Sequence, residues 1–222
     1  MLPIQHSPLS FAWFSVAILL HHRPMKHSLV LALLIAVSNR ASASTNDIHS
    51  VDFKNFHYRP SCLHFGDKPA EVEHWQLSGT GESVVVTNGV LQKNNPDDYL
   101  DFRVCKITYG KPKNFSNDVA IVITICDTGG SGSFSDGFIY GMANGQPKLI
   151  AVIQGGDRAY GAIHSATIEN GLLRVERYGT NFGACCPRWI ETRNYKLLNG
   201  RLVEIGMGRR RKYVEPTCLS EV

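Results

Sequence analysis

Residues 163–178 read IHSATIENGLLRVERY, and this stretch carries a strong local signal for the class of fold. Apolar or alternating runs flank Asn170-Gly171 on both sides, which is typical of two β-strands that each bury one face. Asn and Gly both accept the positive φ angles of a type I′ turn, the two-residue turn that joins antiparallel strands. The stretch therefore predicts a β-hairpin in which Ile163–Glu169 pairs with Leu172–Tyr178.

The Asn-Gly pair recurs at 88–89, 144–145 and 199–200, each time between apolar or alternating runs. Three more hairpins are therefore expected. Their arms are residues 84–87 with 90–93, 138–143 with 146–153, and 195–198 with 201–205. Because each hairpin joins neighbours in the sequence, we expect a meander of antiparallel strands.

Two further segments predict strands. Residues 99–108 (YLDFRVCKIT) alternate with period two. The alternation places Leu100, Phe102, Val104 and Lys106 on one face and Asp101, Arg103, Cys105 and Ile107 on the other. Residues 119–125 (VAIVITI) are apolar almost throughout, as in a central strand covered on both faces. About ten strands in all predict a mainly β fold with little helix, built as an antiparallel hairpin meander in a curved sheet, a sandwich or an open barrel.

One segment is ambiguous. Asp67-Lys68-Pro69 precedes residues 70–75 in the manner of a helix start, with Asp67 as the cap and proline near the first turn. The same residues also suit an edge strand, and the sequence leaves both structures open.

The composition narrows the class of protein. The 222 residues are 43% hydrophobic and 19% charged, with 20 Gly and 10 Pro, which excludes collagen, coiled coils and wholly disordered chains. The formal charge is +4, but residues 1–43 hold three basic residues and no acid. The rest of the chain carries 20 basic against 19 acidic residues, so a basic face for nucleic acid is not expected.

The amino-terminal region has the pattern of an export signal. Met25-Lys26-His27 is a positive start, and residues 28–37 are an apolar run. This run is shorter than the roughly 20 residues that a transmembrane helix needs. Ala41-Ser42-Ala43 follows as a small-x-small cleavage motif.

These signals divide the chain into three parts. We expect residues 1–24 to be an upstream extension or a mis-assigned start, residues 25–43 to be the signal peptide, and residues 44–222 to be a single disulfide-linked β domain. The mature protein would then be secreted or periplasmic, without a transmembrane anchor after signal cleavage.

Six cysteines lie beyond the signal peptide: Cys62, Cys105, Cys126, Cys185, Cys186 and Cys218. An even number in an exported chain predicts disulfides, and the spacing matches no zinc site. Adjacent Cys185 and Cys186 would close only a strained ring, so each should reach a separate partner. The expected partners are Cys126 and Cys62. That choice leaves Cys105 to pair with Cys218.

Several segments together resemble a known family. They are VDFKNF at 51–56, CDTGG at 126–130, GGDRA at 155–159, ENGL at 169–172, VERYG at 175–179 and GACCPRW at 183–189. The chain resembles a family of exported bacterial proteins that carries no assigned activity and is distantly similar to the LppP/LprE-type lipoproteins of actinobacteria. The resemblance implies export and a β-rich domain. Relatives often carry an acidic, calcium-like loop where residues 109–118 hold lysines here, which argues against a metal site at that place.

Asp127-Thr128-Gly129 follows the apolar strand in the manner of an aspartic protease site. That chemistry needs two Asp carboxylates that share a proton. Cys126 directly before Asp127 suggests a disulfide-bonded turn instead. Asp127 is thus a weak catalytic candidate, and a strand end followed by a Gly-rich loop is the simpler interpretation.

Residues 155–161 (GGDRAYG) are the better binding candidate. The loop places Asp157, Arg158 and Tyr160 in one tight turn, where the glycines let the backbone approach a ligand closely. A local contact between Asp157 and Arg158 that braces the loop is the alternative. Residues 209–212 (RRRK) are expected to form a solvated tail, which in an exported protein can also contact anionic envelope groups.

The sequence therefore favours an exported β domain that binds an envelope component or a secreted protein, without catalytic activity, cofactor or metal. Two alternatives stay open. One is a proteinaceous inhibitor of a secreted hydrolase that inserts the loop at 155–161. The other is a hydrolase that uses Asp127.

Overall fold

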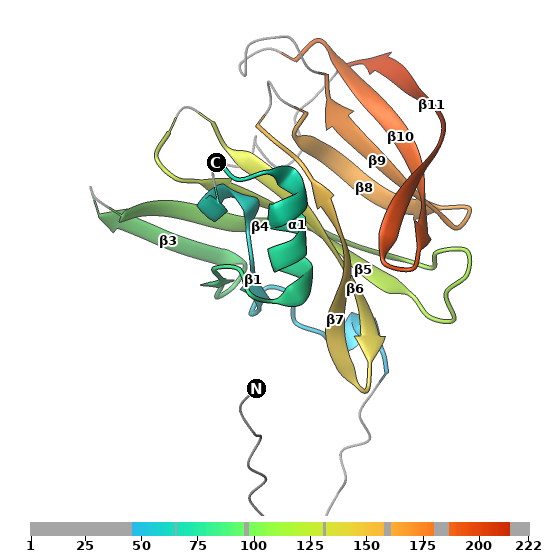
Figure 1. The fold of residues 1–222 in the computed structure, drawn as a ribbon, viewed down its shortest axis with the longest axis horizontal. Helices are drawn as coiled ribbons and strands as arrows, with labels where there is room; N and C mark the ends of the chain where they lie inside the picture. The colour runs from blue at the N-terminus through green and yellow to red at the C-terminus, as the bar shows by residue number, and fades with distance from the viewer. Residues whose placement is uncertain are drawn as a thin grey trace, which may run out of the picture. The chain divides into compact units, whose positions relative to one another are not determined.

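The computed structural model describes residues 46–64, 66–95, 98–130, 132–157, 161–179 and 187–213 (Figure 1). The expected upstream extension, signal peptide and cleavage point lie outside these residues. All the described residues belong to one compact unit, Ser42–Val222. Within the described part of the chain, no helix is long and apolar enough to cross a membrane.

The described residues form eleven strands in three antiparallel sheets and one α-helix, so the predicted mainly β, antiparallel fold is confirmed. The five-stranded sheet has the order β3-β4-β5-β6-β7, with β3 (Val90–Asn95), β4 (Asp98–Gly110), β5 (Val119–Asp127), β6 (Phe134–Ala143) and β7 (Gln146–Gln154). The four-stranded sheet has the order β11-β10-β9-β8, with β8 (Ile163–Glu169), β9 (Leu172–Tyr178), β10 (Trp189–Leu198) and β11 (Arg201–Lys212). The remaining elements are the paired strands β1 (His57–Tyr58) and β2 (Val84–Val85), the 3-10 helices η1 (Ile48–Ser50) and η2 (Ser61–His64), and α1 (Pro69–Ser78).

The central strand β5 separates two hydrophobic cores. Ala120 and Val122 enter the first core, and Val119, Ile121 and Ile123 enter the second. The amino-terminal segment covers the first core, and strands β8, β9 and β10 close the second. Because both faces of β5 are covered, its sequence lacks a polar alternation, and the predicted central strand is confirmed.

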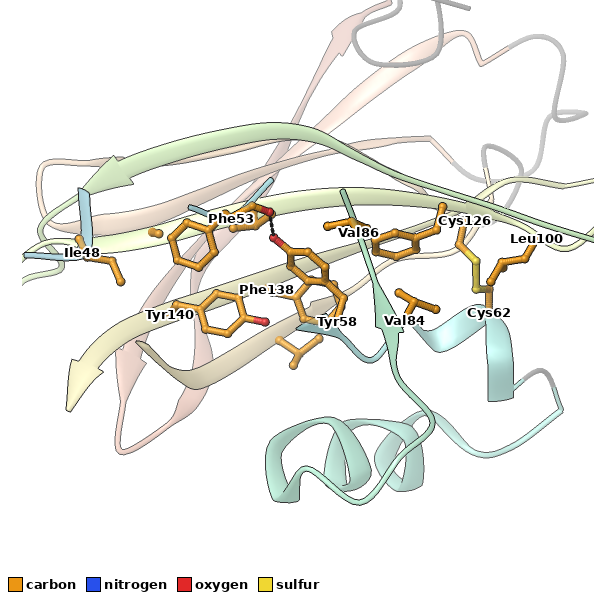
Figure 2. Packing of buried hydrophobic residues seen from close by; sticks show 14 residues of the cluster. Ile48, Phe53, Tyr58, Cys62, Val84, Val86, Leu100, Cys126, Phe138 and Tyr140 are labelled. Carbon is orange, nitrogen blue, oxygen red and sulfur yellow. Dashed lines mark hydrogen bonds between the residues drawn. A yellow bond between two sulfur atoms is a disulfide. The ribbon is translucent and has the colours of Figure 1, made fainter. Parts of the chain in front are cut away.

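The first core is rich in aromatic side chains (Figure 2). Phe53 packs against Tyr140 of β6 with ring centroids 5.1 Å apart, and Tyr58 packs against Phe138 at 5.4 Å. The Tyr58 hydroxyl donates a hydrogen bond to the main-chain oxygen of Phe53, which satisfies its polar group inside the core. These contacts hold the amino-terminal segment on the sheet.

Three of the four predicted hairpins are confirmed. Asn144, Asn170 and Asn199 have φ angles of 51°, 53° and 50°, and the glycine after each is also in the left-handed region. These are the angles of type I′ turns. The turns join β6 to β7, β8 to β9 and β10 to β11.

The predicted pairing around Asn88-Gly89 is wrong beyond the turn itself. Thr87 and Val90 form a single bridge, after which β2 pairs with β1 and β3 pairs with β4. Burial explains the divergence, because Val84 and Val86 belong to the first core. The strand before the turn, β2, therefore pairs with β1 of the amino-terminal segment and not with β3.

The predicted alternation of β4 is correct up to Val104 and then reverses. The register against β5 shifts between Val104 and Lys106, which is a β-bulge with one extra residue. Ile107 therefore packs in the first core together with Phe102. The prediction that these two residues lie on opposite faces, and that Lys106 shares the face of Phe102, is wrong.

The last hairpin is longer than predicted. β11 runs to Lys212, so residues 209–212 belong to an edge strand, and the expected tail after the last strand is wrong. Ile190 of β10 is fully buried and pairs with Arg211. Burial of this end of β10 explains why the arginine run continues the sheet.

The ambiguous segment forms a helix. α1 starts at Pro69 and ends before Gly79, whose φ of 77° is the left-handed conformation that often ends helices. Lys68 is the N-cap residue and makes no side-chain hydrogen bond, so the cap expected at Asp67 is absent. Val72 and Gln76 are buried. Tertiary packing of this face, more than a cap, selects the helix over the edge strand.

Cys62 of η2 and Cys126 of β5 are disulfide-bonded to each other, with Cα atoms 6.2 Å apart (Figure 2). The predicted pairing of these two cysteines with Cys185 and Cys186 is therefore wrong. Cys126 faces the first core, which also contains Cys62, so packing of the amino-terminal segment brings the two thiols together. Cys105 is also disulfide-bonded. Its predicted partner, Cys218, lies outside the described residues, as do Cys185 and Cys186.

Candidate binding cleft

A cleft with a volume of about 740 Å³ lies between α1, β7 and the β10–β11 hairpin. Clefts of this size are typical of small-molecule sites. Its lining includes Glu73, His74 and Leu77 of α1, Ile150 and Gln154 of β7, and Tyr195 of β10. The walls therefore offer both apolar contact and hydrogen-bonding groups.

Helical spacing turns one face of α1 toward the cleft. Ala70, Glu73 and Leu77 line it at intervals of three and four residues, as neighbours on one helix face do. On another face, the Gln76 side chain is buried, and its Nε2 donates to the main-chain oxygen of Arg59 at 2.8 Å. This hydrogen bond thus fixes the position of α1, which forms one wall of the cleft.

Gln154 and Arg177 hold the cleft together at the end of β7. Gln154 Nε2 donates to the main-chain oxygen of Pro69 at 2.5 Å, which ties the first turn of α1 to the strand. Arg177 Nη1 of β9 donates to the main-chain oxygens of Gln154 at 2.6 Å and Gly161 at 3.1 Å. Both sheets and the helix are therefore connected around the cleft.

The Arg177 side chain is half-buried and lies on the same face of β9 as Leu173 and Val175 of the second core. Burial lowers the pKa of its guanidinium, against the opposing effect of the nearby Tyr195. A guanidinium is nevertheless protonated at any physiological pH. The two carbonyl oxygens that accept its hydrogen bonds offset part of the free energy needed to bury this charge.

The candidate loop at 155–161 borders the cleft, since it starts directly after Gln154 and ends at a residue bound by Arg177. The Gly/Ser loop at 128–133 lies beside it, because a Cβ built on Gly132 would be 2.7 Å from a carboxylate oxygen of Asp157. The structure thus brings together two segments that sequence patterns suggested separately. Arg158 and Tyr160 lie outside the described residues, so their roles and the Asp157–Arg158 contact stay predictions.

The start of this loop is held against β6. A Cβ on Gly155 would clash with the main-chain oxygen of Ser135. Ser135 N donates to the main-chain oxygen of Gly156 at 3.1 Å, and Ser135 Oγ accepts from the N–H of Ile163 at 2.7 Å. The close approach that the glycines allow at Gly155 is therefore to the protein's own backbone.

Asp127 lies at the end of β5, and its Oδ1 accepts a hydrogen bond from Gly129 N at 2.8 Å. The register places Asp101 of β4 opposite Asp127, and no local sequence pattern links these two carboxylates. Two hydrogen bonds from Arg103 lower the pKa of Asp101. An ionised Asp101 is unsuited to share a proton as the carboxylates of an aspartic protease do. The geometry thus supports the strand-end interpretation of Asp127.

A metal site among the described residues would need several side chains that can bind the ion together. No group of three or more His, Cys, Asp or Glu side chains there is placed to hold a metal ion.

Sequence patterns missed the cleft because its walls come from five separate elements, α1, β7, β9, β10 and β11. The sequence did hold a sign that Arg177 is unusual. By period two it shares one face of β9 with Leu173 and Val175, which are both buried. An arginine on the buried face of a strand points to a polar function inside the fold.

Comparison with known proteins adds no relative: no protein-family model matches the chain, and no curated protein matches it significantly.

Proposed function

We propose that this protein is a non-enzymatic binding module of the cell envelope, and that the cleft between α1, β7 and the β10–β11 hairpin is its ligand site. The observation that carries the proposal is a cleft of about 740 Å³ whose walls are tied together by Gln154 and Arg177. Walls that are already ordered lose little conformational entropy on binding, which favours affinity.

The lining indicates the chemistry of the ligand. Leu77 and Ile150 offer apolar surface, while His74, Gln154 and Tyr195 carry hydrogen-bonding groups. Such a mixed wall suits a small molecule that has both an apolar part and several hydroxyl, amide or similar polar groups.

Export of this module is part of the proposal and is supported by sequence. The signal pattern at 25–43 and the family resemblance both imply it. The disulfide bonds of Cys62, Cys126 and Cys105 are in keeping with an oxidising compartment. Amino-terminal sequencing of the exported protein should begin at Ser44, and an intact Met1 terminus would contradict this part of the proposal.

The cleft is tested by capture of ligands from an envelope extract of the producing cell, followed by mass spectrometry of small molecules. Leu77→Trp places a large ring into the cleft and should abolish enrichment of any ligand that the wild type retains. Glu71→Trp, on an exposed position of the same helix outside the cleft lining, is the matched control and should retain it. Equal capture by all three proteins, or capture of nothing, overturns the cleft as the site.

A second candidate function is inhibition of a secreted hydrolase by the loop at 155–161. The observation that favours it is that the loop is held at both ends. Ala162 N donates to the main-chain oxygen of Asp157 at 2.8 Å, and Arg177 binds Gly161. Ends that are already fixed lower the entropic loss when a loop binds an active site. Assays against a panel of secreted hydrolases test this candidate.

The third hypothesis, a hydrolase that uses Asp127, is separated from the other two by Asp127→Asn. This substitution should abolish any hydrolysis that the wild type performs, while ligand capture by the cleft should be unchanged.

A further inference from the structure

The outer face of the four-stranded sheet carries a second hollow, with a volume of about 470 Å³. Its lining includes Arg174, Thr192, Asn194, Arg209, Arg210 and Arg211, none of which lines the cleft. Period two explains the location: Leu173 and Val175 of β9 point into the second core, so Arg174 between them points away from it. We refer to this feature as the arginine hollow.

Cross-strand register brings its side chains together. Thr192 of β10 pairs with Glu176 of β9 on one side and with Arg209 of β11 on the other. Two residues along β10, Asn194 pairs with Arg174. Residues at paired positions of an antiparallel sheet point to the same face. The hollow is thus lined by neighbouring side chains from three strands.

Glu176, Thr192 and a residue of β11 form a row across the three strands, and an irregularity in β11 selects which residue that is. The register of β10 and β11 shifts between Thr192 and Asn194, because Asn194 pairs with Ile205 while Thr192 pairs with Arg209. Without this shift Met207 would lie opposite Thr192. Instead Met207 is 94% exposed. The bulge therefore places an arginine, and not an apolar side chain, beside the hollow.

Glu176 holds two of the guanidinium groups in place. Its Oε1 accepts from Arg174 Nη2 at 2.9 Å, and its Oε2 accepts from Arg211 Nη2 at 2.8 Å and from Ser165 Oγ at 3.1 Å. Burial alone would raise the pKa of Glu176, but hydrogen bonds from Arg211 and Ser165 and the charges of Arg211 and Arg174 lower it to about 2. The carboxylate is therefore ionised at physiological pH. Since a guanidinium has more N–H donors than these bonds use, both arginines keep donors for a ligand.

Positive charge exceeds negative charge at this face. Arg174, Arg209 and Arg211 point to this face, whereas Glu169 and the buried Glu176 are the acids beside them. Arg210 pairs with Glu191 and stacks over the Trp189 ring at 5.3 Å, so its charge is held on the other face of β11. Arg209 forms no ion pair with any residue that the structure describes, although it lies in the row with Thr192 and Glu176. Its charge is available for an anion.

We propose that the arginine hollow binds the phosphate group of a phosphorylated sugar or polyol, through Arg209 together with Arg174 and Arg211. A phosphate presents oxygen atoms on several sides and accepts charge-assisted hydrogen bonds from several guanidinium groups at once. The remaining volume holds the neutral part of the ligand, with the Thr192 hydroxyl and the Asn194 amide as hydrogen-bonding groups. This site goes beyond the proposed function, since it lies on the opposite face of the β8–β11 sheet from the cleft.

The same chemistry occurs in a soluble phosphate ester and in a phospholipid headgroup, so the test has an arm for each. Glycerol 3-phosphate is titrated into the purified full chain by calorimetry and by NMR of the Thr192 and Asn194 amides. In parallel, the chain is sedimented with phosphatidylglycerol vesicles and with phosphatidylcholine vesicles. Arg209→Gln is the test variant, because Arg209 is exposed and its removal breaks no described ion pair. Lys196→Gln, which removes the same charge from an exposed position of β10 outside both the hollow and the cleft, is the matched control.

We expect binding of glycerol 3-phosphate, with shifts at Thr192 and Asn194, that Arg209→Gln weakens about tenfold or more and Lys196→Gln leaves unchanged. Binding to phosphatidylglycerol vesicles alone, with the same dependence on Arg209, also supports the site and assigns the phosphate to a lipid headgroup. Failure of both probes to bind overturns the proposal. Equal weakening by the two variants also overturns it, because binding would then follow net charge and not the hollow.

Discussion

Asp136 of β6 accepts a hydrogen bond from the main-chain N–H of Ser61 at 2.7 Å, so a carboxylate inside the domain holds the residue that precedes Cys62. Asp136 is only 2% exposed, and its Oδ1 has no hydrogen-bond partner among the described residues. Burial raises the pKa of Asp136 to about 6, although the hydrogen bonds of Ser61 act in the opposite direction. The folded state thus favours the protonated acid, and this makes the free energy of unfolding depend on pH.

Asp136→Asn should remove this dependence. The folded pKa of about 6 exceeds the ordinary value of 3.8, so the stabilising contribution of Asp136 is complete below the ordinary value and is lost as pH rises through about 6. We expect the variant to be more stable than the wild type by up to about 3 kcal/mol at about pH 7.5, and similar to it at about pH 4. Urea unfolding at both pH values measures the difference. A difference that does not change with pH would contradict the assignment.

The Cys62–Cys126 disulfide closes a loop of sequence separation 64 between η2 and β5. Cys62→Ala/Cys126→Ala should lower the free energy of unfolding by about 2–4 kcal/mol, mainly because the unfolded chain gains conformational freedom. Chemical denaturation of both proteins without reductant measures this loss. If the double variant unfolds at the same denaturant concentration as the wild type, the bond does not restrain the chain as inferred here.

Gly171 and Gly206 allow a matched test of backbone conformation. Both have positive φ, 76° and 72°, but a Cβ on Gly171 would lie 3.0–3.2 Å from Lys113 atoms, whereas a Cβ on Gly206 would meet nothing within 4 Å. Gly206→Ala should therefore cost about 1 kcal/mol from the backbone alone. Gly171→Ala should cost clearly more, because it also displaces the Lys113 N–H from the Gly171 oxygen, at 2.8 Å. Thermal unfolding of the two variants gives the comparison, and equal losses would contradict the close approach.

Arg177→Met should loosen the cleft and the loop beside it. The variant leaves the carbonyl oxygens of Gln154 and Gly161 without their donor, so we expect a loss of about 2–3 kcal/mol in the free energy of unfolding. Hydrogen exchange of the Ala162 amide, which is bound to Asp157, should become faster.

Arg193→Met is the control for this substitution. Arg193 is 39% exposed and pairs with Glu191 and Glu204. Surface ion pairs of this kind contribute about 0–1 kcal/mol, so the control should lose less stability and leave the exchange of Ala162 unchanged. Similar effects of both variants would indicate that Arg177 acts through charge and not through its two carbonyl contacts.

The hairpins could be predicted because their signal is local. Asn144, Asn170 and Asn199 each precede a glycine, and positive φ at both positions is a property of the dipeptide itself. Asn88-Gly89 shows the limit, since its turn forms but its first arm leaves the hairpin to bury Val84 and Val86. Tertiary burial overrides local pairing there.

Local sequence signals were enough to predict the mainly β class, the type I′ turns and the central position of β5, because turn angles and the pattern of apolar residues depend on neighbours along the chain. Packing in the folded domain selects the Cys62–Cys126 pairing, the cleft bounded by Arg177, and the row that joins Glu176 to Arg209. Each of these depends on which face of one element packs against another, or on a bulge that shifts the register. Contacts between residues so far apart in sequence leave no local signal, because the free energy that selects them comes from burial in the assembled layers.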